Sequence, residues 1–400
     1  MNASPTTEAA RAAGRPLRYR EADCRVGDLD ALVRRPTDLA AYPHAHEVAR
    51  QVLLYDAAAL RRAVADPAGR AAVEDELVRA LSDGPGVVVL QGAFDDLGVV
   101  DRVTGAFDAM VADERAAGGR RSDHFAAAGA NDRVWNALEK LAVRHPEAFV
   151  DYYGNDVLAL VATAWLGPSY QMTSQVNVVR PGGVAQEPHR DYHLGFLSNP
   201  VAAEYPAHVH LLSPVLTLQG AVAHSDMPVE SGPTMYLPYS HRYEPGYLAW
   251  RLPEFREYFA QHHVQLPLAK GDAVFFNPAV FHGAGSNVSR DVQRMANLLQ
   301  VSSAFGRAME SVNRIRTAAA VYPALRARRA AGAGARALAN AVTCAADGYP
   351  FPTNLDLDPN VDGLTPLSQA ELLHRALAED WDAARTEAEL AAHAARRRTH

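Results

Sequence analysis

The sequence has very little cysteine, no long apolar run and no excess of basic charge. Its 400 residues include only Cys24 and Cys344, which are too few for a disulfide framework and lie in no metal-binding spacing. No stretch reaches the roughly 18 apolar residues that a membrane-spanning helix needs. A net charge of −7 with a pI near 6.1 gives no electrostatic reason to expect nucleic acid or an anionic membrane as a partner.

The N-terminal residues also lack the apolar segment of a secretory signal peptide. Residues 1–20 are largely Ala, Thr, Arg, Gly and Pro without periodicity, a composition that predicts a disordered tail. With so few cysteines, a reducing cytoplasmic location fits best. Hydrophobic residues make up 48% of the chain and charged residues 21%, so a substantial core can form, and we expect residues 21–400 to be a single domain.

Helical periodicity dominates residues 41–166. Apolar positions recur at intervals of three and four over 46–66, 70–82, 96–116, 131–143 and 155–166. Between the second and third of these segments, residues 86–90 form a short apolar run bounded by turn residues, which predicts a buried strand.

The pattern changes over residues 167–305, where short β-rich runs are separated by Pro and Gly. These runs are 170–180, 215–223, 233–238, 263–268, 273–277 and 294–303. A helical pattern returns over 306–400. Helices are expected at 316–345 and 367–395, with an extended surface segment between them. No internal repeat is visible. The simplest architecture is a mainly β core, a double-stranded β-helix or jelly roll, with flanking α-helices at both ends.

The residues that carry most chemical information are His189, Asp191 and His282. A strand carries alternate side chains on one face, so His189 and Asp191 can point the same way. His282 lies on a remote part of the chain and would complete the set. Two imidazoles and one carboxylate on one face of a metal ion leave open coordination positions, as in non-haem Fe(II) oxygenases. This pattern predicts an iron-dependent oxidising enzyme.

Other histidines offer competing sets, because the chain has 16 of them. His193 continues the alternation of His189 and Asp191, so these three could line one face of a strand. His208 and His210 are separated by the same interval. An H-x-D or H-x-H spacing alone is therefore weak evidence for a metal site.

The context of His282 favours it as the third ligand. It follows an apolar run and precedes a Gly-rich turn, while His189 follows Pro181-Gly182-Gly183. Both segments fall where strands of a sandwich are expected to end, a position that suits a site at a barrel mouth. His193 and His241 are expected to lie at most beside the metal or on the substrate side.

An iron enzyme that activates oxygen needs two further electrons, which a keto-acid cosubstrate usually supplies. Such a dianion requires a fixed cation near its far carboxylate, and Arg binds a carboxylate in a bidentate manner. Arg290 and Arg294 follow His282 in the sequence, and Arg290 lies in a polar turn where we expect it to be exposed. Arg294 opens an apolar strand, where a charge needs a partner, and it is the predicted anchor.

At this point the sequence resembles the phytanoyl-CoA dioxygenase family of Fe(II)/2-oxoglutarate oxygenases. The resemblance rests on five elements in a fixed order between about 170 and 305. They are Val179-Arg180-Pro181-Gly182-Gly183 leading into Glu187-Pro188-His189-Arg190-Asp191, then Glu230-Ser231-Gly232-Pro233-Thr234, Lys270-Gly271-Asp272-Ala273-Val274 and His282-Gly283-Ala284-Gly285-Ser286-Asn287, closing with Arg294. Their order and placement are far more specific than the H-x-D spacing alone.

The resemblance implies that His189, Asp191 and His282 bind iron and that Arg294 anchors 2-oxoglutarate. In the family this arginine usually comes eleven residues after the distal histidine. Here Gln293 holds that position and Arg294 holds the next one. The sequence departs from the family pattern at this point, and Arg294 remains the predicted anchor.

A second departure lies two residues after the distal histidine. Family members often have Ser or Thr there to help hold the same carboxylate, whereas this chain has Ala284. Gln175 or Asn177 on a preceding strand is expected to serve instead. The cofactors that the resemblance implies are Fe(II), 2-oxoglutarate as cosubstrate, and O2.

The implied reaction releases succinate and CO2 and hydroxylates an unactivated C–H bond. Related halogenases have a small residue in place of Asp191, so the carboxylate favours hydroxylation, or else desaturation, epoxidation or cyclisation. Two other classes stay open. One is a zinc hydrolase, although no H-E-x-x-H motif is present. The other is a metal-binding jelly roll without enzymatic activity.

The substrate is expected to be a small molecule, and the sequence leaves its identity and the oligomeric state open. Arg190 and Arg242 would suit an acyl-CoA if they lay at a cavity mouth, although a solvated position is commoner for such residues. Because the chain has little basic character, a free metabolite or natural-product intermediate is at least as plausible as an acyl-CoA. The candidate pocket aromatics are Tyr192, Phe196, Tyr236 and Tyr239.

Overall fold

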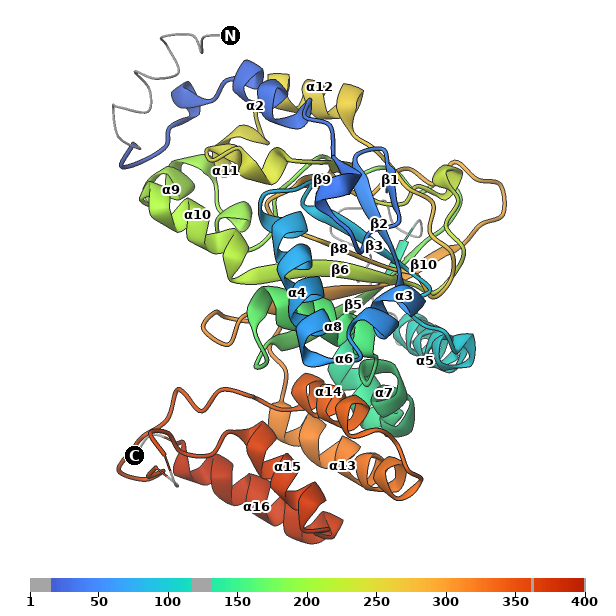
Figure 1. The fold of residues 1–400 in the computed structure, drawn as a ribbon, viewed down its shortest axis with the longest axis vertical. Helices are drawn as coiled ribbons and strands as arrows, with labels where there is room; N and C mark the ends of the chain where they lie inside the picture. The colour runs from blue at the N-terminus through green and yellow to red at the C-terminus, as the bar shows by residue number, and fades with distance from the viewer. Residues whose placement is uncertain (1–15, 117–130, 361–362, 399–400) are drawn as a thin grey trace.

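A large twisted sheet runs through the middle of the molecule in a computed structural model that describes residues 16–116, 131–360 and 363–398 (Figure 1). Its eight strands have the order β1-β2-β3-β8-β6-β10-β5-β4. All neighbouring pairs are antiparallel except β2 and β3, which are parallel. The strands are β1 (Glu47–Ala49), β2 (Val52–Asp56), β3 (Val87–Gln91), β4 (Asn131–Val134), β5 (Gln171–Val179), β6 (Thr217–Ala223), β8 (Ala273–Phe276) and β10 (Arg294–Ser302).

A second, two-stranded sheet pairs β7 (Met235–Leu237) with β9 (Phe281–Gly283). Isolated bridges extend it, including one between His189 and His282. A cavity lies between the two sheets, because its lining residues come from β3, β5, β6, β8 and β10 on one side and from β7 and β9 on the other. This mixed α/β architecture, with a large and mostly antiparallel sheet, is consistent with a jelly-roll-like core.

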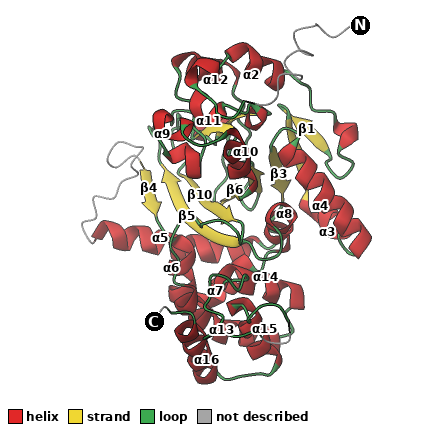
Figure 2. Ribbon diagram, turned by 90° about the vertical axis from the view of Figure 1, so that its left-hand side faces the viewer, coloured by secondary structure: helices red, strands yellow, loops and turns green. Residues whose placement is uncertain are grey.

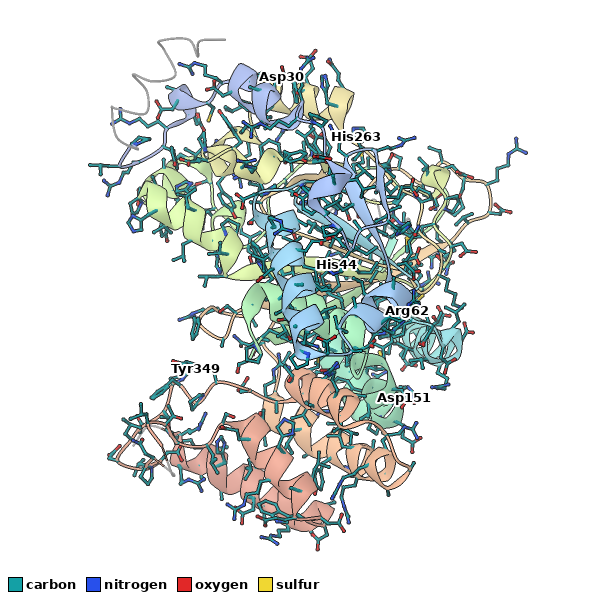
Figure 3. All side chains as sticks on the ribbon, in the orientation of Figure 1. Asp30, His44, Arg62, Asp151, His263 and Tyr349 are labelled. Atoms are coloured by element: carbon teal, nitrogen blue, oxygen red, sulfur yellow. The ribbon has the colours of Figure 1, made fainter. Side chains whose placement is uncertain are left out.

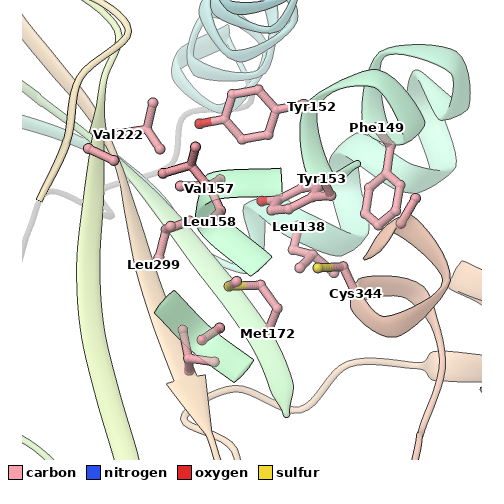
Figure 4. Close-up of a cluster of buried hydrophobic side chains, with 14 of the residues drawn as sticks. Leu138, Phe149, Tyr152, Tyr153, Val157, Leu158, Met172, Val222, Leu299 and Cys344 are labelled. Atoms are coloured by element: carbon pink, nitrogen blue, oxygen red, sulfur yellow. The ribbon is translucent and has the colours of Figure 1, made fainter. Parts of the chain in front are cut away.

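Helices cover the face of the large sheet that points away from this cavity (Figure 2). Those that precede the β-rich segment are α3 (Ala57–Ala63), α4 (Pro67–Ser82), α5 (Leu97–Ala116), α6 (Ala137–Arg144), α7 (Pro146–Tyr153) and α8 (Asp156–Leu166). The earlier helix α2 (Val26–Val33) packs instead with Met235 and Leu237 of the small sheet. The core between sheet and helices includes Met172, Val222 and Leu299 from the strands and Leu158 from α8 (Figure 4). Burying such apolar side chains is the main stabilising contribution to the fold.

The alternation of side chains along each strand separates the two faces of the sheet. In β10, Leu299 and Val301 belong to the core under the helices, whereas Leu298 and Gln300 line the cavity. The same alternation in β6 directs Gln219 toward the cavity. The sheet therefore has a helix-covered outer face and a cavity-lining inner face.

The predicted helix over 46–66 is wrong in its first half, which forms β1 and β2. Arg50 and Gln51 adopt positive φ angles of 48° and 73° and turn the chain into a hairpin. Val52–Asp56 then pairs with β3, so tertiary pairing outweighs the helical spacing of its apolar residues. Only α3 retains the expected helix.

The predicted helix over 131–143 also begins with a strand. Residues 131–134 form β4, the edge strand beside β5, and Asn136 at φ 50° separates it from α6. Helix α7 follows immediately and was not predicted. The expected helices over 70–82, 96–116 and 155–166 and the strand over 86–90 are confirmed by α4, α5, α8 and β3.

The β-rich segment contains four helices that the sequence analysis did not predict. They are α9 (Asn199–Ala203), α10 (Ala207–Val215), α11 (Gly246–Ala249) and α12 (Pro253–His262). The run 263–268, expected to be a strand, makes only isolated bridges at Val264 and Leu268. The other five expected strands are present, with β7 shorter than predicted.

Four helices after the β-rich segment form the lower part of Figure 1. They are α13 (Arg314–Ala330), α14 (Ala335–Ala345), α15 (Gln369–Ala378) and α16 (Ala383–Arg396), so each of the two predicted helices is divided in two. Gly332 at φ 86° and Asp380 at φ 52° mark the breaks. Arg328 of α13 donates to Asp151 of α7 (Nε to Oδ1, 2.6 Å), and Asp151 is labelled beside α13 in Figure 3.

The N-terminal tail is only partly described. Residues 1–15 lie outside the described residues, but Tyr19 is buried and hydrogen bonded to Glu244, so the packed part of the chain begins before residue 21. Within the described residues, no helix has both the length and the apolar character of a membrane span. The single domain and the cytoplasmic location remain predictions.

Candidate active site

His189, Asp191 and His282 come together at the inner face of the small sheet. His189 and His282 exchange backbone hydrogen bonds of 2.9 and 3.2 Å, which fixes the two segments side by side. Asp191 lies between the rings, with carboxylate oxygens 3.7 Å from His189 Nε2 and 3.5 Å from His282 Nε2. The three ligand atoms lie within 4.8 Å of one another, and this is the only such group found in the part of the chain that the structure describes.

Both imidazoles are oriented by the backbone. His189 Nδ1 donates to the carbonyl of Glu187, and His282 Nδ1 donates to the carbonyl of Val280, each at 2.9 Å. A hydrogen on Nδ1 leaves the Nε2 lone pair of each ring directed at the centre of the group. Metal-binding histidines commonly donate their other ring nitrogen to a backbone carbonyl in this way. Burial lowers the pKa of His189, which favours the neutral ring that a metal requires.

The carboxylate of Asp191 is held by an amide. Gln219 Nε2 of β6 donates to Asp191 Oδ2 and also to Gln300 Oε1 of β10 at 3.2 Å. Burial alone would raise the pKa of Asp191, but His189, His282 and the Gln219 amide lower it below its usual value. A carboxylate anion and two imidazole nitrogens therefore face the same small space, where a metal ion could bind.

The cavity between the sheets has a volume of about 150 Å³ and contains the three-residue group in its wall. Its apolar lining includes Val89, Leu266, Leu268, Val274 and Phe276, all of them buried. Apart from the three-residue group, Gln186 and Thr234, its polar and charged lining comes from the inner face of the large sheet. These residues are Arg133, Gln175, Asn177, Gln219, Arg294 and Gln300.

Arg294 is a buried cation in this cavity. It is 6% exposed, and burial lowers its pKa to about 10, so the guanidinium remains charged at neutral pH. Among the described residues, no carboxylate lies within ion-pair distance of it. Its neighbours Gln293 and Arg290 are both exposed and line no part of the cavity. Of the two arginines weighed as the anchor, Arg294 is the one that lines the cavity.

Gln175 and Asn177 also face the cavity from β5. Gln175 Oε1 accepts a hydrogen bond from Arg133 Nη1 at 3.0 Å, which leaves its Nε2 as a buried donor without a partner. Asn177 Oδ1 is likewise buried without a partner. Buried polar atoms of this kind usually have a hydrogen-bond partner, so these two point to a polar ligand.

The competing histidines do not join the group. Tyr192 and His193 have positive φ angles of 62° and 38°, which ends the extended alternation after Asp191 and turns His193 toward Ser213 Oγ (2.8 Å). His208 and His210 lie on α10 rather than on a strand, where residues two apart do not share a face.

His241 is also remote from the cavity wall. Its Nε2 donates to the carbonyl of Ser82 at the end of α4, and its ring lies against Gly86. The suggestion that His193 or His241 lies beside the metal or substrate is therefore wrong for His241, which lines no part of the cavity. His193 is exposed on the segment that follows Asp191 and lines no part of the cavity either.

The two arginines considered for an acyl-CoA are engaged elsewhere. Arg190 is 2% exposed, donates to the carbonyls of Ser240 and Tyr243, and stacks on the Phe281 ring at 5.0 Å. A side chain at Gly246 would collide with this guanidinium, so the space around it is filled. Arg242 donates to the carbonyl of Asp83, outside the cavity lining. Neither arginine lies at the cavity mouth.

Two of the four proposed pocket aromatics line the cavity. Tyr236 is buried there, and Phe196, which is 55% exposed, lies at its rim. Tyr192 and Tyr239 are buried outside the lining, and the Tyr239 hydroxyl pairs with Thr37 Oγ1. The last two predictions are therefore wrong.

Four residues that line the cavity were not predicted from the sequence: Gln219, Gln300, Arg133 and Trp135. The first two were detectable, because each is a polar residue on the same strand face as buried apolar neighbours. A polar side chain inside such a strand needs a partner on that face. Arg133 and Trp135 could not be found in this way, since their segment was predicted to be helical.

Comparison with known proteins identifies the family to which the chain belongs. The sequence matches the family described as phytanoyl-CoA dioxygenase (PhyH) over residues 82–296, which is more than half of the chain. The chain belongs to this family, and the resemblance inferred from its motifs is confirmed. A search of curated proteins finds no significant match.

Several solved structures resemble parts of the chain. The non-haem α-ketoglutarate-dependent carbocyclase SnoK from nogalamycin biosynthesis is 24% identical, with a TM-score of 0.39, over 57% of this chain and 83% of that one. The epimerase SnoN from the same biosynthesis is 21% identical, with a TM-score of 0.37, over 60% and 84%. AviO1 from Streptomyces viridochromogenes is 19% identical, with a TM-score of 0.41, over 60% and 96%. At these values the likenesses carry no argument about the substrate of this chain.

Proposed function

We propose that this protein is an Fe(II)/2-oxoglutarate-dependent dioxygenase acting on a small molecule, with its site in a double-stranded β-helix. The observation that carries the proposal is the convergence of His189, Asp191 and His282 in the same cavity as the buried cation Arg294. Family membership supports the same class of chemistry.

The three residues fit a ferrous ion. Two neutral imidazole nitrogens and one carboxylate oxygen form a facial set that leaves positions open for other ligands. The backbone carbonyls that orient the rings and the Gln219 amide that holds Asp191 fix this set before a metal arrives. We therefore assign His189, Asp191 and His282 as the iron ligands.

The inner face of the large sheet fits 2-oxoglutarate. Arg294 would bind the far carboxylate of the dianion, which supplies the counter-charge that a buried guanidinium needs. Gln175 Nε2 is a buried donor without a present partner, and it would donate to this carboxylate in place of the hydroxyl that Ala284 cannot provide. The unpartnered atom of Asn177 is Oδ1, which accepts, so Asn177 would contribute through its Nδ2.

Iron bound here with 2-oxoglutarate and O2 supplies an oxidant able to break an unactivated C–H bond, with succinate and CO2 as products. The protein's own part is positioning and exclusion of water. The apolar cavity wall would exclude water from the reacting centre, and Arg294 would set the orientation of the bound cosubstrate. Hydroxylation is the proposed reaction. Desaturation, epoxidation and cyclisation would need the same iron and cosubstrate ligands, and the structure of the substrate would decide between them.

A zinc hydrolase is less well supported. It needs a general base beside the metal-bound water, in addition to the ligands. Among the cavity-lining residues that the structure describes, Asp191 is the only carboxylate, and it belongs to the ligand set. The described lining thus offers no carboxylate beyond the ligand set to act as this base.

An anaerobic titration tests the proposed function. Adding Fe(II) and 2-oxoglutarate to the protein should produce a weak visible charge-transfer band with one equivalent of each, and His282→Ala should abolish it. Admission of O2 should then release succinate. A protein that binds zinc tightly but develops no such band with iron and 2-oxoglutarate would contradict the proposal.

A further inference from the structure

The amide group of Gln300 has a defined orientation in the cavity wall. The Asp191 carboxylate can only accept hydrogen bonds, so the Gln219 atom that faces it is the donor Nε2. The same Nε2 faces Gln300 at 3.2 Å, so the Gln300 atom at this contact is the acceptor Oε1. Because the carboxylate fixes the two amides in turn, the remaining polar atom of the Gln300 side chain is the donor Nε2.

Gln300 Nε2 has no hydrogen-bond partner among the described residues, yet it is not enclosed. Gln300 is 7% exposed and lines the cavity. Two other amide atoms of the same wall, Gln175 Nε2 and Gln219 Oε1, are fully enclosed without a partner, and Gln300 Nε2 is not such an atom. It therefore keeps contact with the cavity space. A donor in this position is available to an acceptor atom of a bound molecule.

Gln300 and Arg294 lie at opposite ends of the inner face of β10. Gln300 comes six residues after Arg294, so their backbone positions are about 20 Å apart at the rise of a β-strand. Gln300 is registered opposite Gln219, which holds Asp191, whereas Arg294 is registered opposite Val179. A cosubstrate anchored on Arg294 would therefore approach the metal group from one end of the cavity. The Gln300 donor serves the other end.

The lining near Gln300 is apolar and open to solvent. Met309 follows the end of β10, Trp135 follows β4, and Phe196 ends the short 3-10 helix after Asp191. Phe196 is 55% exposed and the other two are half-buried, whereas the apolar lining from β3 and β8 is buried. Large apolar side chains exposed at the mouth of a cavity mark a place where an apolar molecule binds.

We infer that this end of the cavity binds the substrate, which is a lipophilic molecule whose carbonyl oxygen accepts a hydrogen bond from Gln300 Nε2. The inference rests on the proposed function and narrows its substrate class. The apolar body of the molecule lies against Phe196, Trp135 and Met309. Because Gln219 bonds to both Gln300 and Asp191, it sets the position of the carbonyl oxygen relative to the metal group.

Two probes of matched shape test the inference by binding rather than by turnover. 2-Acetylnaphthalene and 2-isopropenylnaphthalene have nearly the same planar shape, but the second has a methylene group in place of the carbonyl oxygen. Each would be titrated, with ligand-observed NMR, into the protein loaded with Zn(II) and 2-oxoglutarate. The ketone should bind about fivefold more tightly, which is the gain from one neutral hydrogen bond.

Hydrophobicity alone predicts the reverse order, because the alkene is the more apolar of the two probes. Equal affinities, tighter binding of the alkene, or no binding of the ketone would overturn the inference.

Substitution of Gln300 assigns the preference to its amide. In Gln300→Leu the affinity for the ketone should fall about fivefold, while the alkene binds as before because the apolar contacts remain. Gln293→Leu is the matched control, since Gln293 is exposed and lines no part of the cavity. It should retain the full preference. If Gln300→Leu weakens both probes equally, Gln300 shapes the site without donating to the substrate, and the inference is wrong.

Substitution of Phe196 locates the apolar body of the probe. Phe196→Ala should weaken both probes by a similar factor, about fivefold, and leave the preference for the ketone intact, because it removes only aromatic contact. Phe305→Ala is the matched control, since Phe305 is 76% exposed and lies outside the cavity lining. Unchanged affinities in Phe196→Ala would place the probes elsewhere and contradict the inference.

The cosubstrate separates this inference from the proposed function. Gln300→Leu should bind 2-oxoglutarate within about twofold of the unmodified protein, because well-separated sites act independently, whereas Arg294→Gln should not. If Gln300→Leu loses 2-oxoglutarate as Arg294→Gln does, Gln300 holds the cosubstrate and the inference is wrong, although the proposed function survives. If the unmodified protein shows no metal-dependent binding of 2-oxoglutarate, both are wrong.

Discussion

The outer and inner faces of the large sheet are built from alternate residues of the same strands. They differ in how many of their buried polar atoms have hydrogen-bond partners. On the outer face, His224 Nδ1 pairs with Thr104 and Nε2 with Tyr152. Asn297 donates to Tyr152 and Tyr153, and only its Oδ1 is buried without a partner. On the inner face, Gln175 Nε2, Asn177 Oδ1 and Gln219 Oε1 are buried without partners.

This difference indicates that the outer face mainly stabilises the fold and the inner face mainly binds ligands. Figure 4 shows Tyr152 and Tyr153 in the same buried cluster as Leu299. Paired polar groups among these packed side chains stabilise the fold without needing a ligand. Unpaired groups around a cavity cost stability until a ligand satisfies them. The inner face is therefore organised for a metal, a cosubstrate and a substrate, and a substitution should affect the property of the face that it modifies.

The largest effect is expected for His282→Ala. Removing one of three ligands should lower iron-dependent 2-oxoglutarate decarboxylation by a factor on the order of 1000 or more, while the fold is retained because the ring faces the cavity. Succinate release and thermal melting measure the two properties. His208→Ala, which replaces an exposed histidine on α10, is the control and should change neither. An unchanged rate in His282→Ala would remove this residue from the metal site.

Arg294→Gln should raise the concentration of 2-oxoglutarate needed for half-saturation on the order of 100-fold, because it removes a buried charge that pairs with a carboxylate. The iron requirement should change far less. Titrations of each ligand at saturating levels of the other would measure this difference. Arg290→Gln is the matched control at an exposed position four residues earlier. If Arg290→Gln shows the defect and Arg294→Gln does not, the anchor is misassigned.

Neighbouring leucines of β10 compare the two faces directly. Leu299 is fully buried on the outer face, so Leu299→Ala should lower the free energy of unfolding by about 3 kcal/mol. Leu298 is half-buried and lines the cavity, so Leu298→Ala should cost about 1 kcal/mol or less. Urea unfolding of both variants measures the difference. Equal losses would mean that the faces do not differ as described.

The pH dependence of stability gives the smallest effect. Burial lowers the pKa of His224 to about 3, below its ordinary value of 6.5, so the unfolded chain binds a proton that the folded protein excludes. Stability should therefore be lost as the pH falls below about 6.5, by about 2 kcal/mol between pH 7.5 and 5. Urea unfolding should show a weaker pH dependence in His224→Gln, and His208→Gln should match the unmodified protein. Parallel pH profiles for all three would contradict this account.

The sequence predicted the site better than it predicted the fold. His189, Asp191 and His282 could be identified because strand alternation and flanking turns are local signals, and the structure places all three together. The choice of Arg294 over Arg290 followed from a similar argument about a charge in an apolar strand. Their roles as ligands and anchor remain proposals.

The failures arose where tertiary contacts decide the structure. The apolar spacing of 52–56 and 131–134 is compatible with a helix, and only the neighbouring strands β3 and β5 make these segments extended. The spacing of His193 fits the alternation of side chains along a strand from His189. In the structure, positive φ angles at Tyr192 and His193 end the extended conformation before His193. Arg133 was missed for the same reason, because it lines the cavity only through its place on the edge strand β4.

A crystal structure of the protein with Mn(II) and 2-oxoglutarate, phased to locate the metal by its anomalous scattering, tests the central claim most directly. We predict one strong peak about 2.0–2.3 Å from His189 Nε2, an Asp191 oxygen and His282 Nε2, with the far carboxylate of 2-oxoglutarate on Arg294. A metal bound elsewhere, or a cosubstrate whose far carboxylate does not contact Arg294, would contradict the account.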